Sequence, residues 1–213
     1  LQRDEGGVYI RCPNTSCPAQ LRHRVAFFAG RNQMDIGTLG RELVAQLVDR
    51  GLVRHVTDLY VLDPEQVEQL DRMGAVSTKN LMDGIEASKG RGLARVLAAL
   101  GIRHVGSRAA ELLAEQFGTL DALAAADVED ITSVNGIGEK IATAVCEYFK
   151  SPEGQMTVAR LKEAGVRLEE EARQAGGTLP LEGKTVVVTG TLEQFSRKEA
   201  EAAARAAGGK PTS

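Results

Sequence analysis

The chain has 213 residues and a formal net charge of -3, with 43% hydrophobic, 26% charged and only 4% aromatic residues. These values suit a globular protein of one to three domains with aliphatic cores. No run is long and apolar enough to span a bilayer, and the start lacks a signal-peptide pattern, so membrane and secreted classes are excluded and a cytoplasmic or nucleoid location is expected. The sequence lacks an initiator methionine and ends just after a glycine pair, so we expect a piece of a longer protein.

Residues 1–30 form a short, polar and irregular segment that holds two of the three cysteines, Cys12 and Cys17. A structural zinc site needs four ligands, and this pair supplies half of them. Two interpretations stay open: a zinc site with its other pair upstream, for which His23 is a candidate third ligand, or two free thiols. Cys146 lies in a later helical stretch and is expected to be a buried apolar residue.

From residue 31 to residue 168 the apolar residues recur with helical spacing, which predicts a mainly α-helical domain. Two apolar stripes run along it, one formed by Leu39, Leu43, Leu47 and Val48 and the other by Ala109, Leu112, Leu113 and Phe117. Helix breaks are expected at the usual stop and start residues, Gly51, Asp63 with Pro64, Gly90, Gly118, and Ser151 with Pro152.

Four stretches of this domain share one pattern, an apolar residue, two spacers, a second apolar residue and a glycine. They span residues 36–40, 70–74, 102–106 and 134–138 and are numbered hairpins 1 to 4. Their terminal glycines lie 32 to 34 residues apart, and an amphipathic stretch with helical spacing follows each one. The repeat predicts four units of short helix, tight hairpin and helix.

A glycine turn that opens a helix leaves backbone N–H groups unpaired, and the helix dipole adds partial positive charge at the same place. Such a turn can hold a phosphate, and several in a row would hold a duplex by its backbone without reading its sequence. The alternative is a helical repeat whose glycines only permit close turns. Four copies at nearly constant spacing favour phosphate binding.

The distribution of charge supports this interpretation better than the net charge does. Residues 1–34 carry five arginines against two acids, and residues 89–108 carry five basic residues and no acid. A basic cluster is usually a solvated face, but the second cluster runs directly into hairpin 3. We therefore expect it to contact phosphate.

The last part of the sequence changes its pattern. Residues 169–180 are acidic and then glycine-rich, which is typical of a linker. Residues 184–189 are β-branched and predict a buried strand, followed by an alanine-rich helix up to Gly208 and a second strand from Lys210. We expect residues 181–213 to be the first part of an α/β domain with a parallel sheet.

Three segments carry a resemblance to a known family. Residues 11–20, 34–40 and 100–106, which read RCPNTSCPAQ, MDIGTLG and LGIRHVG, resemble bacterial NAD-dependent DNA ligases. The order of the parts is also similar: the second half of a four-cysteine zinc finger, a helix-hairpin-helix domain, and the start of a BRCT domain. The resemblance covers essentially the whole chain and implies a C-terminal fragment.

The resemblance implies an enzyme that seals nicks between 5′-phosphate and 3′-hydroxyl in duplex DNA during replication and repair, with NAD and magnesium as cofactors. The adenylated lysine of these ligases lies in a Lys-x-Asp-Gly motif, which this chain lacks, so the fragment is expected to be inactive alone. The resemblance further implies a monomer that binds nicked double-stranded DNA without sequence preference, and zinc held by Cys12 and Cys17 with two upstream ligands.

The four hairpins are unequal. Hairpin 4 alone has glycine at both the third and the fifth residue of the pattern. In the other three hairpins the third residue is Thr38, Arg72 or His104. A β-branched residue such as Thr38 resists the positive φ that glycine accepts, and Arg72 and His104 offer a side-chain phosphate donor instead. Hairpins 3 and 4 are expected to be the strongest contacts. The expected DNA-binding residues are Gly40, Gly74, Arg103, His104, Gly106, Arg108, Gly136, Gly138 and Lys140.

Two other hypotheses stay open at this point. One is a noncatalytic or nuclease-associated helix-hairpin-helix module that recognises DNA junctions or lesions. The other is a helical scaffold whose BRCT-type end recruits proteins. Thr189 and Gly190 fit the phosphate-holding position of phosphopeptide-binding BRCT domains, but a plain connection between strand and loop is favoured, and we assign them no binding role.

Overall fold

The computed structural model describes residues 17–170, the short stretches 2–3, 10–11, 184–187 and 207–212, and residues 181, 200, 203 and 204. Contacts divide the chain into two compact units, Leu1–Glu171 and Ala172–Ser213, which we describe separately. In the described part of the chain, none of the helices combines the length and the apolar character needed to cross a membrane.

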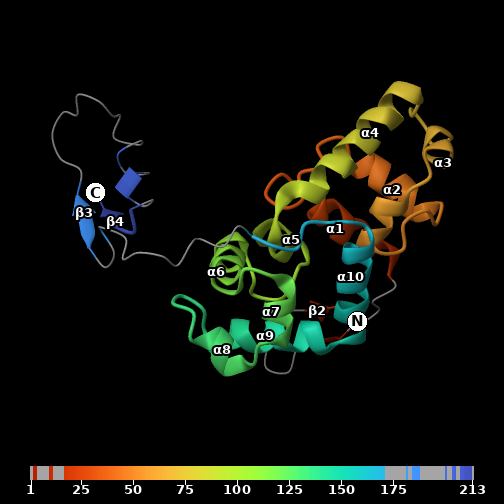
Figure 1. Cartoon of the computed structure of the whole chain (residues 1–213). Coiled ribbons are helices and arrows are strands. Elements are labelled where there is room, and N and C mark those ends of the chain that lie inside the picture. The colour runs from red at the N-terminus through yellow and green to blue at the C-terminus, as the bar shows by residue number, and fades with distance from the viewer. Residues whose placement is uncertain are drawn as a thin grey trace. The chain divides into compact units, whose positions relative to one another are not determined.

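The first unit is built almost entirely from helices (Figure 1). Its α-helices are α1 Pro18–Phe28, α2 Arg41–Asp49, α3 Pro64–Glu68, α4 Ala75–Ser88, α5 Leu93–Ala99, α6 Ser107–Phe117, α7 Leu120–Ala125, α8 Val128–Thr132, α9 Glu139–Lys150 and α10 Pro152–Glu163. Two 3-10 helices, η1 Val56–Val61 and η2 Lys89–Arg91, connect them, and strands β1 Gln2–Arg3 and β2 Ile10–Arg11 pair antiparallel. The predicted mainly α-helical fold is confirmed.

The helix boundaries follow local sequence signals. Gly51 and Gly118 adopt positive φ values of 70° and 68° just after α2 and α6, a conformation that favours glycine. Helices α3 and α10 begin with proline, directly after the capping residues Asp63 and Ser151. The prediction of an irregular segment up to residue 30 is wrong for α1, whose Leu21, Val25 and Phe28 are buried; a polar run between them, residues 22–24, obscures their helical spacing.

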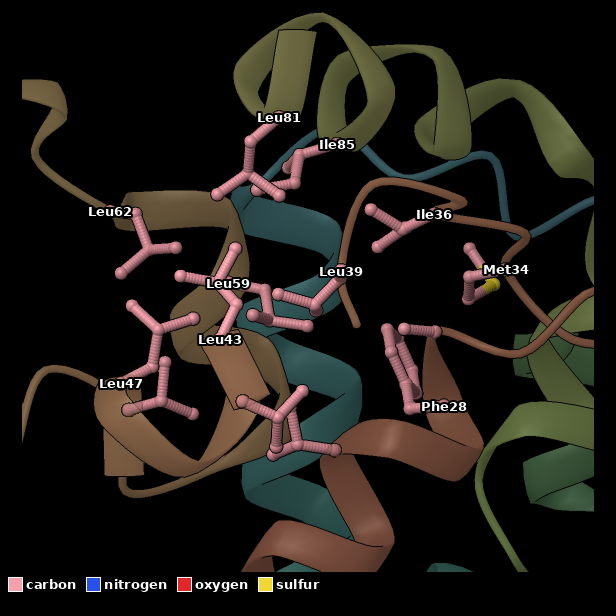
Figure 2. Close-up of a cluster of buried hydrophobic side chains, with 14 of the residues drawn as sticks. Phe28, Met34, Ile36, Leu39, Leu43, Leu47, Leu59, Leu62, Leu81 and Ile85 are labelled. Atoms are coloured by element: carbon pink, nitrogen blue, oxygen red, sulfur yellow. The ribbon is translucent and has the colours of Figure 1, made fainter. Parts of the chain in front are cut away.

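Each consecutive pair of hairpins builds one hydrophobic core. Hairpins 1 and 2 share a core in which α1, α2, η1 and α4 meet, and Figure 2 shows Leu39, Leu43 and Leu47 near Leu59 and Leu81 in it. Hairpins 3 and 4 share a second core formed by α5 to α9. Cys146 lies in this second core and is 6% exposed, so its predicted burial is confirmed. The four-fold repeat therefore folds as two pairs.

Helix α10 links the two pairs. It contacts α9 of the second pair and η1 of the first, and its Leu161 is fully buried in the first core. The Arg160 guanidinium lies 3.0 Å from the Asp58 carboxylate in η1. The chain after α10 continues this role, because the backbone N–H of Arg167 donates to Lys89 at 2.8 Å and that of Glu170 donates to Gly118 at 2.8 Å. The two hairpin pairs are thus braced by one C-terminal segment.

In the second unit, strands β3 Thr185–Val187 and β4 Lys210–Thr212 pair in parallel, with Val186 opposite Pro211. The strand predicted from Lys210 is confirmed. The prediction that the first strand is buried is wrong for the described residues, because Val187 is 53% exposed and Thr185 is also exposed. Within the described part of this unit β3 has a single neighbouring strand, too little sheet to cover its side chains. Thr189 and Gly190 lie outside the described residues.

Candidate nucleic-acid interface

The four hairpins share one backbone hydrogen bond. In each one the backbone N–H of the second apolar residue donates to the carbonyl of the first, with N···O distances of 2.9 to 3.1 Å. The first apolar residue is buried in every hairpin, and the two spacers and the terminal glycine are exposed. Each hairpin is therefore anchored by apolar side chains and presents its backbone to solvent.

The third residue of the turn separates hairpin 1 from the others. Arg72, His104 and Gly136 have positive φ values of 62°, 67° and 95°, the signature of a type II turn, whereas Thr38 is not in this region. The expectation that Thr38 resists positive φ is confirmed. Arg72 and His104 hold a conformation that costs L residues of this kind about 1–2 kcal/mol. The backbone is therefore strained at Arg72 and His104, where glycine would not be.

The terminal glycines, Gly40, Gly74, Gly106 and Gly138, are the N-caps of α2, α4, α6 and α9. Each has an extended backbone, with φ between -73° and -146°, which any residue adopts. A Cβ atom built on any of the four would meet nothing within 4 Å. The fold itself therefore does not require glycine at these positions, which points to a close approach from outside.

Most of the remaining α-helices show the opposite arrangement, although α1, with Cys17 as its N-cap, also lacks a side-chain cap. Side chains of Asp63, Thr119, Asp127 and Ser151 accept backbone N–H bonds at the starts of α3, α7, α8 and α10. Helix α5 also begins at a glycine, but the Glu170 carboxylate reaches it and accepts from the N–H of Ala94 at 3.1 Å. The helices that follow the hairpins have glycine N-caps without a side-chain cap. Within the described residues, the N–H groups of residues 107, 108, 139 and 140 have no acceptor.

Each hairpin pair frames an open groove. The groove of hairpins 1 and 2, about 390 Å³, is lined by Gly40 and Arg72 among others. The groove of hairpins 3 and 4, about 320 Å³, brings together Arg103, His104 and Lys140. Among the described residues, none of these four basic side chains forms an ion pair with a carboxylate. Both grooves thus combine uncapped helix N-termini with exposed cationic or N–H donor groups.

The structure uses much of the basic cluster of residues 89–108 internally. Lys89 pairs with Glu86 at 2.7 Å, and Arg91 pairs with Asp35 at 2.9 Å. One guanidinium nitrogen of Arg95 donates to the carbonyls of residues 31 and 33, at 2.8 and 2.9 Å. Of this cluster only Arg103 and Arg108 extend into solvent beside hairpin 3, and Arg108 also contacts Glu111 at 3.2 Å. Part of the cluster therefore connects η2 and α5 to the loop after α1.

The predicted zinc ligands are described only in part. Cys17 is half-buried at the N-cap of α1, His23 is exposed on that helix, and Cys12 lies outside the described residues. In the part of the chain that the structure describes, no three metal-ligating side chains lie together. Cys17 therefore remains a candidate ligand by its position alone.

Comparison with known proteins finds similarity at these features. A model of the helix-hairpin-helix motif matches residues 95–158, which contain hairpins 3 and 4. A DNA ligase of Roseiflexus sp. (strain RS-1) is 46% identical over 99% of the chain, and one of Desulforamulus reducens is 48% identical over 98%. Over nearly its whole length the chain is similar to a segment of these bacterial DNA ligases. It spans 29% and 31% of the length of these two ligases.

The motif match and the structure agree on the second hairpin pair. The structure adds hairpins 1 and 2, which lie outside the matched residues but share the backbone hydrogen bond of the turn, the buried first apolar residue and the glycine N-caps. Reasoning from the sequence alone left Arg72 out of the predicted binding residues. Arg72 has a positive φ at the same turn position as His104, and this shared conformation adds Arg72 to the candidate binding residues.

Proposed function

We propose that this chain is the DNA-gripping C-terminal part of an NAD-dependent DNA ligase that seals nicks in duplex DNA. In this role the hairpins that frame the two grooves of the protein hold the phosphate backbone of the duplex, so binding is independent of the DNA sequence. The observation that carries the proposal is the division between capped and uncapped helices. Four times the chain places a glycine where the fold accepts any residue, and each time the N–H groups of a helix start are left available to an outside anion.

A charge-matched pair of variants tests this proposal. Asp is a good N-cap, so Gly138→Asp should keep or slightly raise the stability of α9 while it occupies the free N–H groups and repels phosphate. We expect its affinity for a labelled duplex, measured by fluorescence anisotropy with the 213-residue chain, to fall about tenfold. The control is Gly90→Asp, which adds the same charge in open space within η2, at a position that is not the N-cap of a hairpin helix.

The wild-type affinity should also fall steeply with salt, with a log-log slope equivalent to about four to eight phosphates. Equal affinities of the two variants, or binding that does not respond to salt, would refute phosphate gripping. Equal affinity for intact and nicked duplexes is compatible with gripping but would place nick recognition in other parts of the enzyme.

The cofactors belong to the same proposal. NAD and magnesium would act in parts of the ligase other than this chain, which lacks the Lys-x-Asp-Gly motif. Zinc would be held by Cys12 and Cys17 together with two ligands from outside this sequence, in a tetrahedral site. Metal analysis of a chain extended upstream tests this point. One zinc ion for each chain is expected, and a chain without zinc, or with zinc that does not depend on the cysteines, would refute the proposal.

A further inference from the structure

Helix α2 of hairpin 1 holds the backbone of hairpin 2. The Gln46 side-chain amide donates to the carbonyl of Asp71 at 3.2 Å and accepts from the N–H of the same residue at 2.7 Å. One turn further along α2, Arg50 donates to the carbonyl of Gln69 at 3.0 Å and lies 3.4 Å from the Asp71 carboxylate. Positions four apart share one face of a helix, so α2 grips hairpin 2 with a single face.

Hairpin 2 is the one that needs this support. Its second apolar residue, Met73, is only half-buried, whereas Leu39, Val105 and Ile137 are buried at the same place in the other hairpins. Its Arg72 also holds a strained positive φ directly after Asp71. In the described residues, hairpins 1, 3 and 4 receive no side-chain bond to their backbone from another hairpin's helix. The hydrogen bonds of Gln46 take the place of a buried anchor.

From these contacts we propose that Gln46 is a positioning residue, which holds hairpin 2 in the geometry for phosphate contact. This inference rests on the proposed function of the hairpins. Gln46 lines the same groove as Gly40 and Arg72, so the residue that orients hairpin 2 belongs to the helix that hairpin 1 opens. The first two hairpins then act as one unit, and the contribution of Arg72 to binding depends on Gln46.

A double-mutant cycle tests this dependence in the 213-residue chain. Gln46→Met preserves the length of the side chain and removes both hydrogen bonds, and Arg72→Ala removes the expected phosphate donor. Each single variant should weaken duplex binding about three- to tenfold and lower the salt slope by about one. If Gln46 acts through hairpin 2, the double variant should bind no more weakly than the weaker single variant, and its slope should also fall by one. Gln66→Met, which loses only a bond to the Asp63 carboxylate, should leave binding unchanged.

The outcomes separate the two ideas. Unchanged affinity of Gln46→Met, or losses that multiply in the double variant, would overturn the positioning role while leaving phosphate gripping intact. A purely structural role for Gln46 would lower the melting temperature and leave the salt slope as it is, which would also overturn the inference. If the wild-type chain shows no salt-dependent binding, or if Gly138→Asp binds as well as wild type, the proposed function fails and the role of Gln46 fails with it.

Discussion

Substitutions of His104 should separate stability from binding, because its side chain and its backbone act in opposite directions. His104 is exposed at the tip of hairpin 3 with φ of 67°, where hairpin 4 has Gly136. The left-handed conformation costs an L residue about 1–2 kcal/mol, which glycine relieves. Glycine also raises the conformational entropy of the unfolded chain, which lowers the free energy of unfolding by about 0.4–1 kcal/mol. His104→Gly should therefore raise the free energy of unfolding by about 1 kcal/mol.

For a unit of this size, 1 kcal/mol corresponds to a rise in melting temperature of about 2–4 °C. His104→Ala removes the same side chain but keeps the strain, so its melting temperature should stay near that of wild type. Both variants lose the same hydrogen-bond donor to phosphate, so each should weaken duplex binding by a similar factor. Calorimetry and fluorescence anisotropy on the two variants check both parts.

The converse substitution serves as the control. Gly136→Ala places a Cβ at a φ of 95° and 3.1 Å from the Leu112 Cδ1 atom, so it should destabilise the second core by about 1–3 kcal/mol. A lower melting temperature for His104→Gly would show that the turn is not strained. Wild-type affinity in both His104 variants would show that the imidazole does not contact phosphate.

Two further predictions concern stability. Thr78 is 2% exposed and its hydroxyl has no hydrogen-bond partner among the described residues, so Thr78→Val should stabilise the protein by about 1 kcal/mol. Thr157→Val loses bonds to the Glu153 carbonyl at 2.7 Å and to His55 Nε2 at 3.3 Å, so it should destabilise the protein by a similar amount. Chemical denaturation measures both variants, and equal effects would contradict the hydrogen-bond assignment. Burial lowers the pKa of His55 below 6.5, against the opposing effect of Asp58 and Glu153. The contribution of His55 to stability is therefore present above pH 6.5 and is lost as the pH falls through its folded-state pKa. His55→Asn should lose less stability than wild type between about pH 7 and 5, and parallel curves of unfolding free energy against pH for the two proteins would refute this.

Local signals in the sequence predicted the hairpins well. The spacing of two apolar residues and a glycine depends only on neighbouring residues, and it identified the buried anchors and the N-cap of all four second helices. The stops at Gly51 and Gly118 and the start at Asp63 were also local, since each depends on the backbone preference or the cap of one residue. Features of this kind are accessible because no distant part of the chain decides them.

Contacts between distant residues were beyond such reasoning. Arg91 and Arg95 looked like part of a phosphate-binding cluster, but their partners come from the loop after α1, about sixty residues earlier. Gln46 carries no local signal, because its role follows from where the fold places Asp71. Basic residues without nearby acids were therefore assigned to DNA when the fold had already used them.

The positions of the carboxylates explain how a chain with net charge -3 presents a site for an anion. Asp63, Glu170 and Asp127 each accept backbone N–H bonds at the start of α3, α5 and α8, the first helices of hairpins 2, 3 and 4. There they neutralise the positive end of the helix dipole. The second helices begin with glycine, so the same positive end stays open on the side that the hairpins present. The N-cap residue differs between these two sets of helix starts, so total charge is a poor guide to what this surface binds.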